Sequence, residues 1–137
     1  MYQLAEARIA IPSSWTDRSV NIFAPESGDG SSLVITRSVV PPNQSFRDYV
    51  ANELSKLANS LPDYTPLLDA ETSVCGRQAY SHEYTLLSEQ TKLYQAITLI
   101  DIGGRALTLT LTSQDDLSCD ARNQLNSILA SIEFESN

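Results

Sequence analysis

The sequence predicts an α+β fold, in which a twisted antiparallel β-sheet of six to seven strands is flanked by two helices. Segments of alternating apolar and polar residues, rich in β-branched side chains, recur through the first 40 residues and from residue 67 to residue 113. A stretch with the spacing of an amphipathic helix follows each of these two regions. At 137 residues the chain has the length of a single domain, residues 1–137, with one core.

The N-terminal quarter is expected to form a meander of three strands. Residues 3–11 and 19–24 have strand patterns, and the turn-rich segment Pro12-Ser13-Ser14 separates them. A polar loop, residues 25–32, then leads to a third strand at residues 33–40. The loop has two glycines but no lysine at the spacing of a phosphate-binding loop, so we expect an ordinary turn.

A helix is expected from Ser45 to about Leu61. Pro41 and Pro42 end the preceding strand, and Ser45 with Asp48 resembles a capping box. Pro62 ends the helix. Its apolar residues form one stripe that must be covered by other parts of the protein. They are Phe46, Tyr49, Val50, Leu54, Leu57, Ala58 and Leu61.

The second half of the chain predicts four antiparallel strands, residues 67–74, 78–87, 92–102 and 105–113, followed by a helix at residues 118–132. Gly103-Gly104 has the composition of a two-residue hairpin turn. In the last strand leucines alternate with threonines, so one face of the strand lies in the core and the other presents hydroxyl groups.

The strand at residues 92–102 carries apolar side chains on both of its faces. Both faces of the sheet must therefore be covered. Two arrangements satisfy this requirement: the two helices lie on opposite faces, or a second subunit or a ligand helix covers part of one face.

Composition excludes several partners. Nine basic residues against seventeen acidic ones give a formal net charge of −8, which disfavours nucleic acid and anionic membrane surfaces.

The N-terminal residues 1–12 contain Glu6 and Arg8 and do not resemble a signal peptide, so we expect a cytoplasmic protein. The longest apolar stretch, residues 96–102, is too short to span a bilayer, and no stable membrane association is expected.

No catalytic constellation is found in the sequence. The single histidine, His82, has no second histidine at the spacing of a zinc protease, and no serine lies in a nucleophile elbow. Cys75 and Cys119 are expected to be unreactive thiols, with a weak disulfide as the alternative. Asp115 and Asp116 are expected to cap the last helix. We therefore predict no enzyme, no metal and no cofactor, although two carboxylates distant in sequence could still meet in space.

Segments in a fixed order along nearly the whole chain resemble those of one known family. They are residues 1–6, residues 12–23, residues 33–38, Phe46-Arg47-Asp48-Tyr49-Val50, Leu61-Pro62-Asp63-Tyr64, Leu93-Tyr94-Gln95 and residues 106–112. In this set the chain resembles the effector-associated (Eag) chaperones of bacterial type VI secretion. These are small cytosolic proteins that hold the hydrophobic N-terminal segments of toxic effectors before export.

The resemblance implies a PsbP-like fold and a homodimer whose sheets form a concave cradle. It implies a chaperone that shields the transmembrane and pre-PAAR region of a cognate effector, often of Rhs type, and promotes its loading onto the spike. It also implies a set of residues that contact the bound helices. These are Ile22, Ala24, Val34, Thr36, Ser38, Leu57, Leu61, Gln95 and Ile97.

One position departs from the family pattern. Where the family leads us to expect a glutamine in the first helix, this chain has Glu53, whose carboxylate cannot donate a hydrogen bond to a carbonyl. Two other functions remain open from the sequence: an immunity protein that binds a toxin domain, and a small ligand-binding or enzymatic domain on the same fold.

Overall fold

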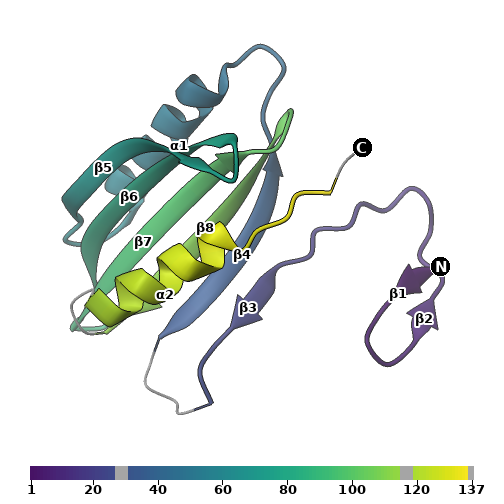
Figure 1. Cartoon of the computed structure of the whole chain (residues 1–137), viewed down its shortest axis with the longest axis horizontal. Coiled ribbons are helices and arrows are strands. Elements are labelled where there is room, and N and C mark those ends of the chain that lie inside the picture. Colours follow the sequence, from purple (N-terminus) through teal and green to yellow (C-terminus); the bar gives the residue numbers. More distant parts are fainter. Residues whose placement is uncertain (27–30, 115–118, 136–137) are drawn as a thin grey trace.

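The protein folds around one six-stranded antiparallel sheet with a helix on each face. The computed structural model describes residues 1–26, 31–114 and 119–135. The strand order is β3-β4-β8-β7-β6-β5. Figure 1 shows α2 in front of the sheet and α1 behind it. The predicted α+β class with a twisted antiparallel sheet and two flanking helices is confirmed.

The strands match the predicted positions closely in the second half of the chain. The bounds are β3 Asn21–Phe23, β4 Ser32–Val39, β5 Thr65–Val74, β6 Arg77–Ser88, β7 Thr91–Asp101 and β8 Arg105–Ser113. The hairpin between β7 and β8 turns through Gly103 and Gly104, whose φ angles are +83° and +74°. Both residues need the left-handed region of backbone space, which glycine enters without strain. The predicted hairpin is confirmed.

The predicted first strand, residues 3–11, is wrong. This segment forms a separate two-stranded sheet of β1 (Tyr2–Gln3) and β2 (Arg8–Ile9). The chain reverses between them, and the Leu4 N–H donates to the Ala7 carbonyl at 2.7 Å. Apolar residues alternate with others on both sides of this reversal, at Tyr2 and Leu4 before it and at Ala7, Ile9 and Ile11 after it, and this pattern predicts strands without showing that they pair with each other.

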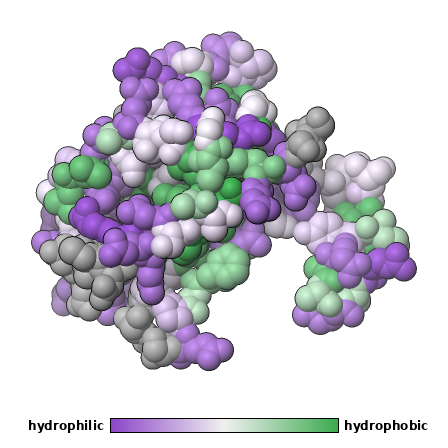
Figure 2. Space-filling model, viewed as in Figure 1, coloured by the Kyte–Doolittle hydropathy of each residue, from purple (hydrophilic) through white to green (hydrophobic). Residues whose placement is uncertain are grey.

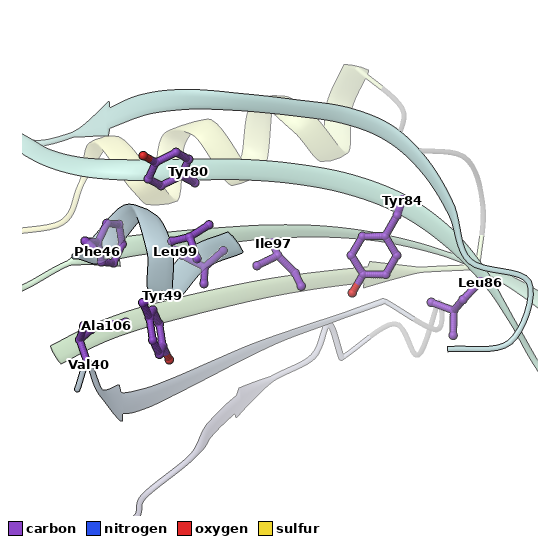
Figure 3. Packing of buried hydrophobic residues seen from close by; sticks show 10 residues of the cluster. Val40, Phe46, Tyr49, Tyr80, Tyr84, Leu86, Ile97, Leu99 and Ala106 are labelled. Carbon is purple, nitrogen blue, oxygen red and sulfur yellow. The ribbon is translucent and has the colours of Figure 1, made fainter. Parts of the chain in front are cut away.

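Helix α1 (Phe46–Ser60) begins where the sequence predicts. Ser45 is the N-cap, and its side chain accepts a hydrogen bond from the Asp48 N–H at 3.1 Å. The helix covers a cluster of buried side chains from β6, β7 and β8 (Figure 3). Tyr84, Ile97 and Leu99 belong to this cluster. We call this side of the sheet the α1 face.

Helix α2 (Cys119–Ala130) covers the opposite side, which we call the α2 face. Leu125 packs on Ala96 of β7, and Leu129 lies beside the cluster that contains Ile100 and Leu109. The predicted caps Asp115 and Asp116 lie outside the described residues. The two helices therefore lie on opposite faces, which is the first of the two arrangements that the apolar strand allowed.

The N-terminal arm, residues 1–20, does not pack on the body of the protein. Every one of its residues is exposed, and Trp15 is 69% exposed. Figures 1 and 2 show the arm standing apart from the sheet with apolar residues on its surface. Among them are Leu4, Ile9 and Ile11. A segment of this composition normally needs a covering surface.

The double-sided core gives a stability prediction. Replacing Ile100, which is 0% exposed, with alanine should lower the free energy of unfolding by about 2–5 kcal/mol, because a cavity forms between β7 and α2. Ile22→Ala should change it by less than about 0.5 kcal/mol, because Ile22 is 68% exposed. Urea denaturation of both variants at one protein concentration measures the difference. Equal losses would contradict this account of the core.

Candidate binding groove

A groove opens on the α1 face between the helix and the neighbouring strand β4. It has a volume of about 840 Å³. Helix α1 contributes Tyr49, Glu53 and Leu57 to its wall, and the sheet contributes Thr36 and Ile97 among others. The groove exists because α1 packs over β6 and β7 and leaves the β3 and β4 side of the same face uncovered.

The strand register brings most of the predicted contact residues to one face. Ile22 pairs with Val34, Val34 pairs with Thr110, and Thr110 pairs with Ile97. Directly paired residues point to the same side of a sheet, so these four side chains form a row across the α1 face. The row starts at the exposed edge strand β3 and ends beneath α1.

The other predicted residues lie along or near this row. Thr36 and Ser38 are two and four residues beyond Val34 on β4, so their side chains share its face. Both line the groove, as Leu57 does from α1. Leu61 caps the C-terminus of α1 and packs against the buried cluster instead. Ala24 follows the end of β3 and is exposed.

Sequence reasoning missed three threonines of β8 as site residues. Thr108, Thr110 and Thr112 pair with Thr36, Val34 and Ser32 of β4, so they share the α1 face with the predicted set. Thr108 lines the groove. The alternation of leucine and threonine in the sequence predicted a hydroxyl-bearing face, but only the register shows that it is the face beside the groove.

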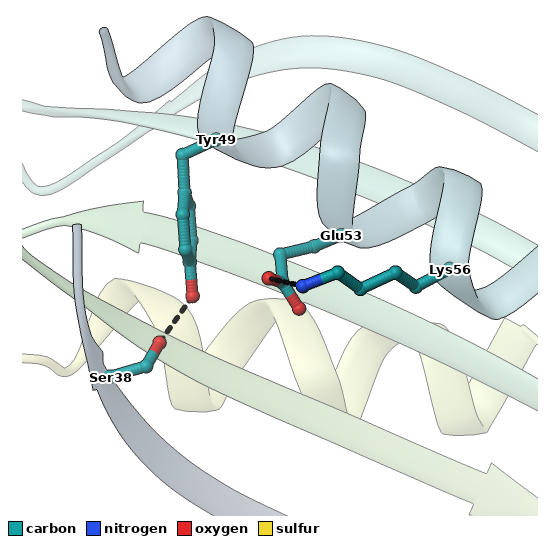
Figure 4. Close-up of polar contacts among 4 residues, drawn as sticks. All are labelled: Ser38, Tyr49, Glu53 and Lys56. Carbon is teal, nitrogen blue, oxygen red and sulfur yellow. Dashed lines mark hydrogen bonds and ion pairs between the residues drawn. The ribbon is translucent and has the colours of Figure 1, made fainter. Parts of the chain in front are cut away.

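A hydrogen bond between Ser38 Oγ and the Tyr49 hydroxyl joins β4 to α1 across the groove (Figure 4). One helical turn further along, Glu53 projects from α1 on the same side as Tyr49. The Glu53 Oε1 atom lies 3.4 Å from the Lys56 Nζ atom. The groove therefore combines apolar side chains, several hydroxyl groups, one acidic residue, Glu53, and two basic residues, Arg37 and Lys56.

The Gln95 side chain is held by two partners inside the protein. Its Oε1 atom accepts a hydrogen bond from the Tyr84 hydroxyl, and its Nε2 atom donates to Thr112 Oγ1 at 3.0 Å. Burial raises the pKa of the Tyr84 phenol well above its usual value, so the phenol stays protonated and remains a donor. These two bonds leave one of the two amide hydrogens of Gln95 for another acceptor.

His82 lies in the core and is 3% exposed. Its Nε2 atom shares a hydrogen bond with the Tyr64 hydroxyl, and its ring stacks on Tyr84 with 5.3 Å between centroids. Cys75 is an exposed free thiol. In the described part of the chain, no three His, Cys, Asp or Glu residues are placed to hold a metal ion. No helix among the described residues is long and apolar enough to cross a membrane.

The sequence matches a known family. Residues 6–131 match the model of the DcrB family. The match covers most of the chain, and the chain therefore belongs to the DcrB family.

A particular relative agrees with the Eag resemblance. The chain is 32% identical over 116 residues to the Pseudomonas aeruginosa protein named Effector EagT6, and the match covers 82% of this chain and 81% of that protein. The predicted resemblance to the Eag proteins is confirmed.

Solved structures share the same architecture. Protein PA94 of Pseudomonas aeruginosa, described as of unknown function, has a TM-score of 0.82 at 28% identity, over 99% of this chain and 96% of that one. LpqN of Mycobacterium tuberculosis, described as involved in cell envelope biogenesis, has a TM-score of 0.62 at 12% identity, over 82% of each chain. At that identity the likeness to LpqN shows the fold alone.

The half-buried amide of Gln95, bonded to the buried Tyr84, gives a second prediction. Gln95→Leu should lower the free energy of unfolding by about 1–3 kcal/mol, because the Tyr84 hydroxyl loses its acceptor in a site that is 1% exposed. Adding Tyr84→Phe should recover part of the loss, since the double variant leaves no unpaired phenol. Chemical denaturation of the two single variants and the double variant tests this. Strictly additive losses would contradict the coupling between the two side chains.

Proposed function

We propose that the protein is a cytoplasmic chaperone that binds and shields the hydrophobic N-terminal segment of a cognate type VI secretion effector. That segment comprises the transmembrane and pre-PAAR region, often of an Rhs-type effector, and the chaperone promotes its loading onto the spike. The main observation in support is the row of side chains that runs from the exposed Ile22 through the half-buried Val34 and Thr110 to the buried Ile97, which lines the groove beside α1. The 32% identity to the protein named Effector EagT6 supports an effector as partner.

The chemistry of the groove suits a helix that normally lies in a membrane. Such a helix has paired its own backbone N–H groups, but each carbonyl keeps a lone pair that a hydroxyl group can contact. Thr36, Ser38 and Thr108 supply hydroxyl groups beside apolar Ile97 and Leu57. Small side chains also allow the close approach that is typical of helices packed in membranes.

Covering the segment supplies the driving force for binding. Each Å² of apolar surface removed from water contributes roughly 25 cal/mol, and a membrane-spanning segment has roughly 20 apolar residues. The chaperone needs no cofactor for this function, because binding depends on surface alone. Release then requires a competing event, such as assembly on the spike or insertion into a membrane.

A homodimer completes the proposal. The arm, residues 1–20, exposes Trp15, Ile9 and Ile11 without a covering surface in its own chain. A second copy that covers this arm would remove these side chains from water and bring two grooves into one assembly. The two α1 faces would then form a shared cradle for the effector segment.

The face that binds the segment is tested by a pair of matched substitutions. Ile22→Asp places a charge on the proposed surface, and we expect it to lower retention of a co-expressed effector N-terminal segment at least tenfold. Leu68→Asp makes the same change at an exposed leucine whose partner in the register, Glu83, lies on the α2 face. This control should retain the segment at wild-type levels.

The same experiment separates the alternatives. Thermal melting of both variants checks that each remains folded. Equal retention of the segment by both variants would show that the α1 face is not the binding surface. Binding of the isolated toxin domain, without the segment, would favour an immunity protein instead.

Dimerisation is tested by mass. Light scattering at micromolar concentration should give about twice the chain mass of 15.0 kDa. Trp15→Asp should shift the protein toward the single-chain mass, because it places a charge in the arm surface that a second copy would bury. The exposed control Glu26→Gln should remain dimeric. A wild-type monomer that still binds the segment would rule out the shared cradle.

A further inference from the structure

Glu53 is the one acidic side chain that lines the groove. Its side chain is 37% exposed, and its only charged neighbour among the described residues is Lys56 at 3.4 Å. The Lys56 side chain is 75% exposed, so this pair is a weak surface interaction. The Glu53 Oε2 atom accepts no hydrogen bond from any described residue.

The other charged residue close to the groove does not neutralise Glu53. Arg37 donates from Nη1 to Asn21 Oδ1 at 2.6 Å and to the Ser19 carbonyl at 3.5 Å. Asn21 pairs with Ile35, on the α2 face of the sheet. Arg37 therefore contributes to the lining of the groove, but its guanidinium group is bonded at the start of β3 and forms no ion pair with Glu53.

Filling the groove with an apolar segment would remove water from Glu53. A carboxylate that loses its water without gaining a partner opposes binding strongly. A hydroxyl group on the segment would donate one hydrogen bond but leave the negative charge uncompensated. A lysine or arginine would supply both the hydrogen bond and the opposite charge.

We propose that Glu53 is a specificity residue that selects an apolar segment bearing one lysine or arginine at the position facing it. This inference rests on the proposed function, since it assumes that the groove holds an apolar helix. Membrane segments commonly carry basic residues at their flanks. A single acid in the groove therefore fixes how far the segment slides along α1, because only one placement joins the two charges.

Lys56 then competes with the basic residue of the segment for the Glu53 carboxylate. In the free protein it lies beside Glu53, and the incoming basic side chain displaces it toward solvent. Removing the Lys56 charge should strengthen the preference for a basic segment, because the basic residue of the segment then pairs with Glu53 without first displacing Lys56. The net charge of −8 on the whole chain also favours a basic ligand over an acidic one.

The test uses model segments, because their sequence can be controlled. A leucine and alanine segment of about 20 residues is fused to a soluble carrier protein, and one position at a time is changed to lysine. Matched fusions carry leucine or glutamate at the same position. Binding of each fusion to the full-length protein is measured in solution at low salt and again at high salt. Melting curves confirm that each variant of the chaperone is folded.

At one position of the series, the wild-type protein should bind the lysine fusion about tenfold more tightly than the leucine fusion. The affinity for the lysine fusion should fall as the salt concentration rises. Glu53→Gln should abolish this preference while leaving binding of the leucine fusion unchanged or stronger. Lys56→Gln should increase the preference. Glu133→Gln removes the same charge at an exposed residue that follows α2, on the other side of the sheet, and should behave as wild type.

The possible failures are distinguishable. If every fusion binds but lysine gives no advantage, or if Glu53→Gln keeps the advantage, Glu53 does not select a basic residue and the proposed chaperone function stands. If the wild-type protein binds none of the fusions, the groove does not accept apolar helices. That result would overturn the proposed function and this inference together.

Discussion

The structure depends on strand β7, which is apolar on both faces and therefore must be covered on both. Ile97 and Leu99 face α1, whereas Ala96 and Ile100 face α2. Residues 96–100 of β7 are buried and exclude water on both faces, and the neighbouring strands β6 and β8 are held in register by that burial. The other strands of the six-stranded sheet and both helices are placed relative to this strand, including the helix that forms one wall of the groove.

The groove forms because α1 covers only part of one face of the sheet. Six strands present a wider face than the single helix α1 can bury. The uncovered part carries the mixed apolar and hydroxyl row between Ile22 and Ile97, which is tolerable in water because its threonines stay hydrated. Such a surface is stable when empty and still offers apolar area when a partner arrives. This combination agrees with the proposed function, in which the protein holds a hydrophobic segment and later releases it.

The sequence predicts the positions of individual helices and strands well. It predicts less well which strands pair with one another and in which register. Alternation, capping residues and the Gly103-Gly104 pair located the central strands and α1, because these signals are local. The N-terminal arm was mistaken for a strand of the main sheet, since alternation does not reveal which neighbour a strand pairs with. For the same reason the threonines of β8 were missed, and the internal bonds of Gln95 to Tyr84 and Thr112 depend on a register that only the folded chain defines.

The alternation of leucine and threonine in β8 gives the two faces of one strand different physical roles. Leu109 is buried toward α2 and constrains stability, while Thr108 and Thr110 face the groove side and are only partly buried. Substitutions at the threonine positions change the shape and polarity of the open surface without creating cavities in the core. Single replacements at alternate positions of β8 can therefore alter the open surface, and each replacement leaves the packing beneath it intact.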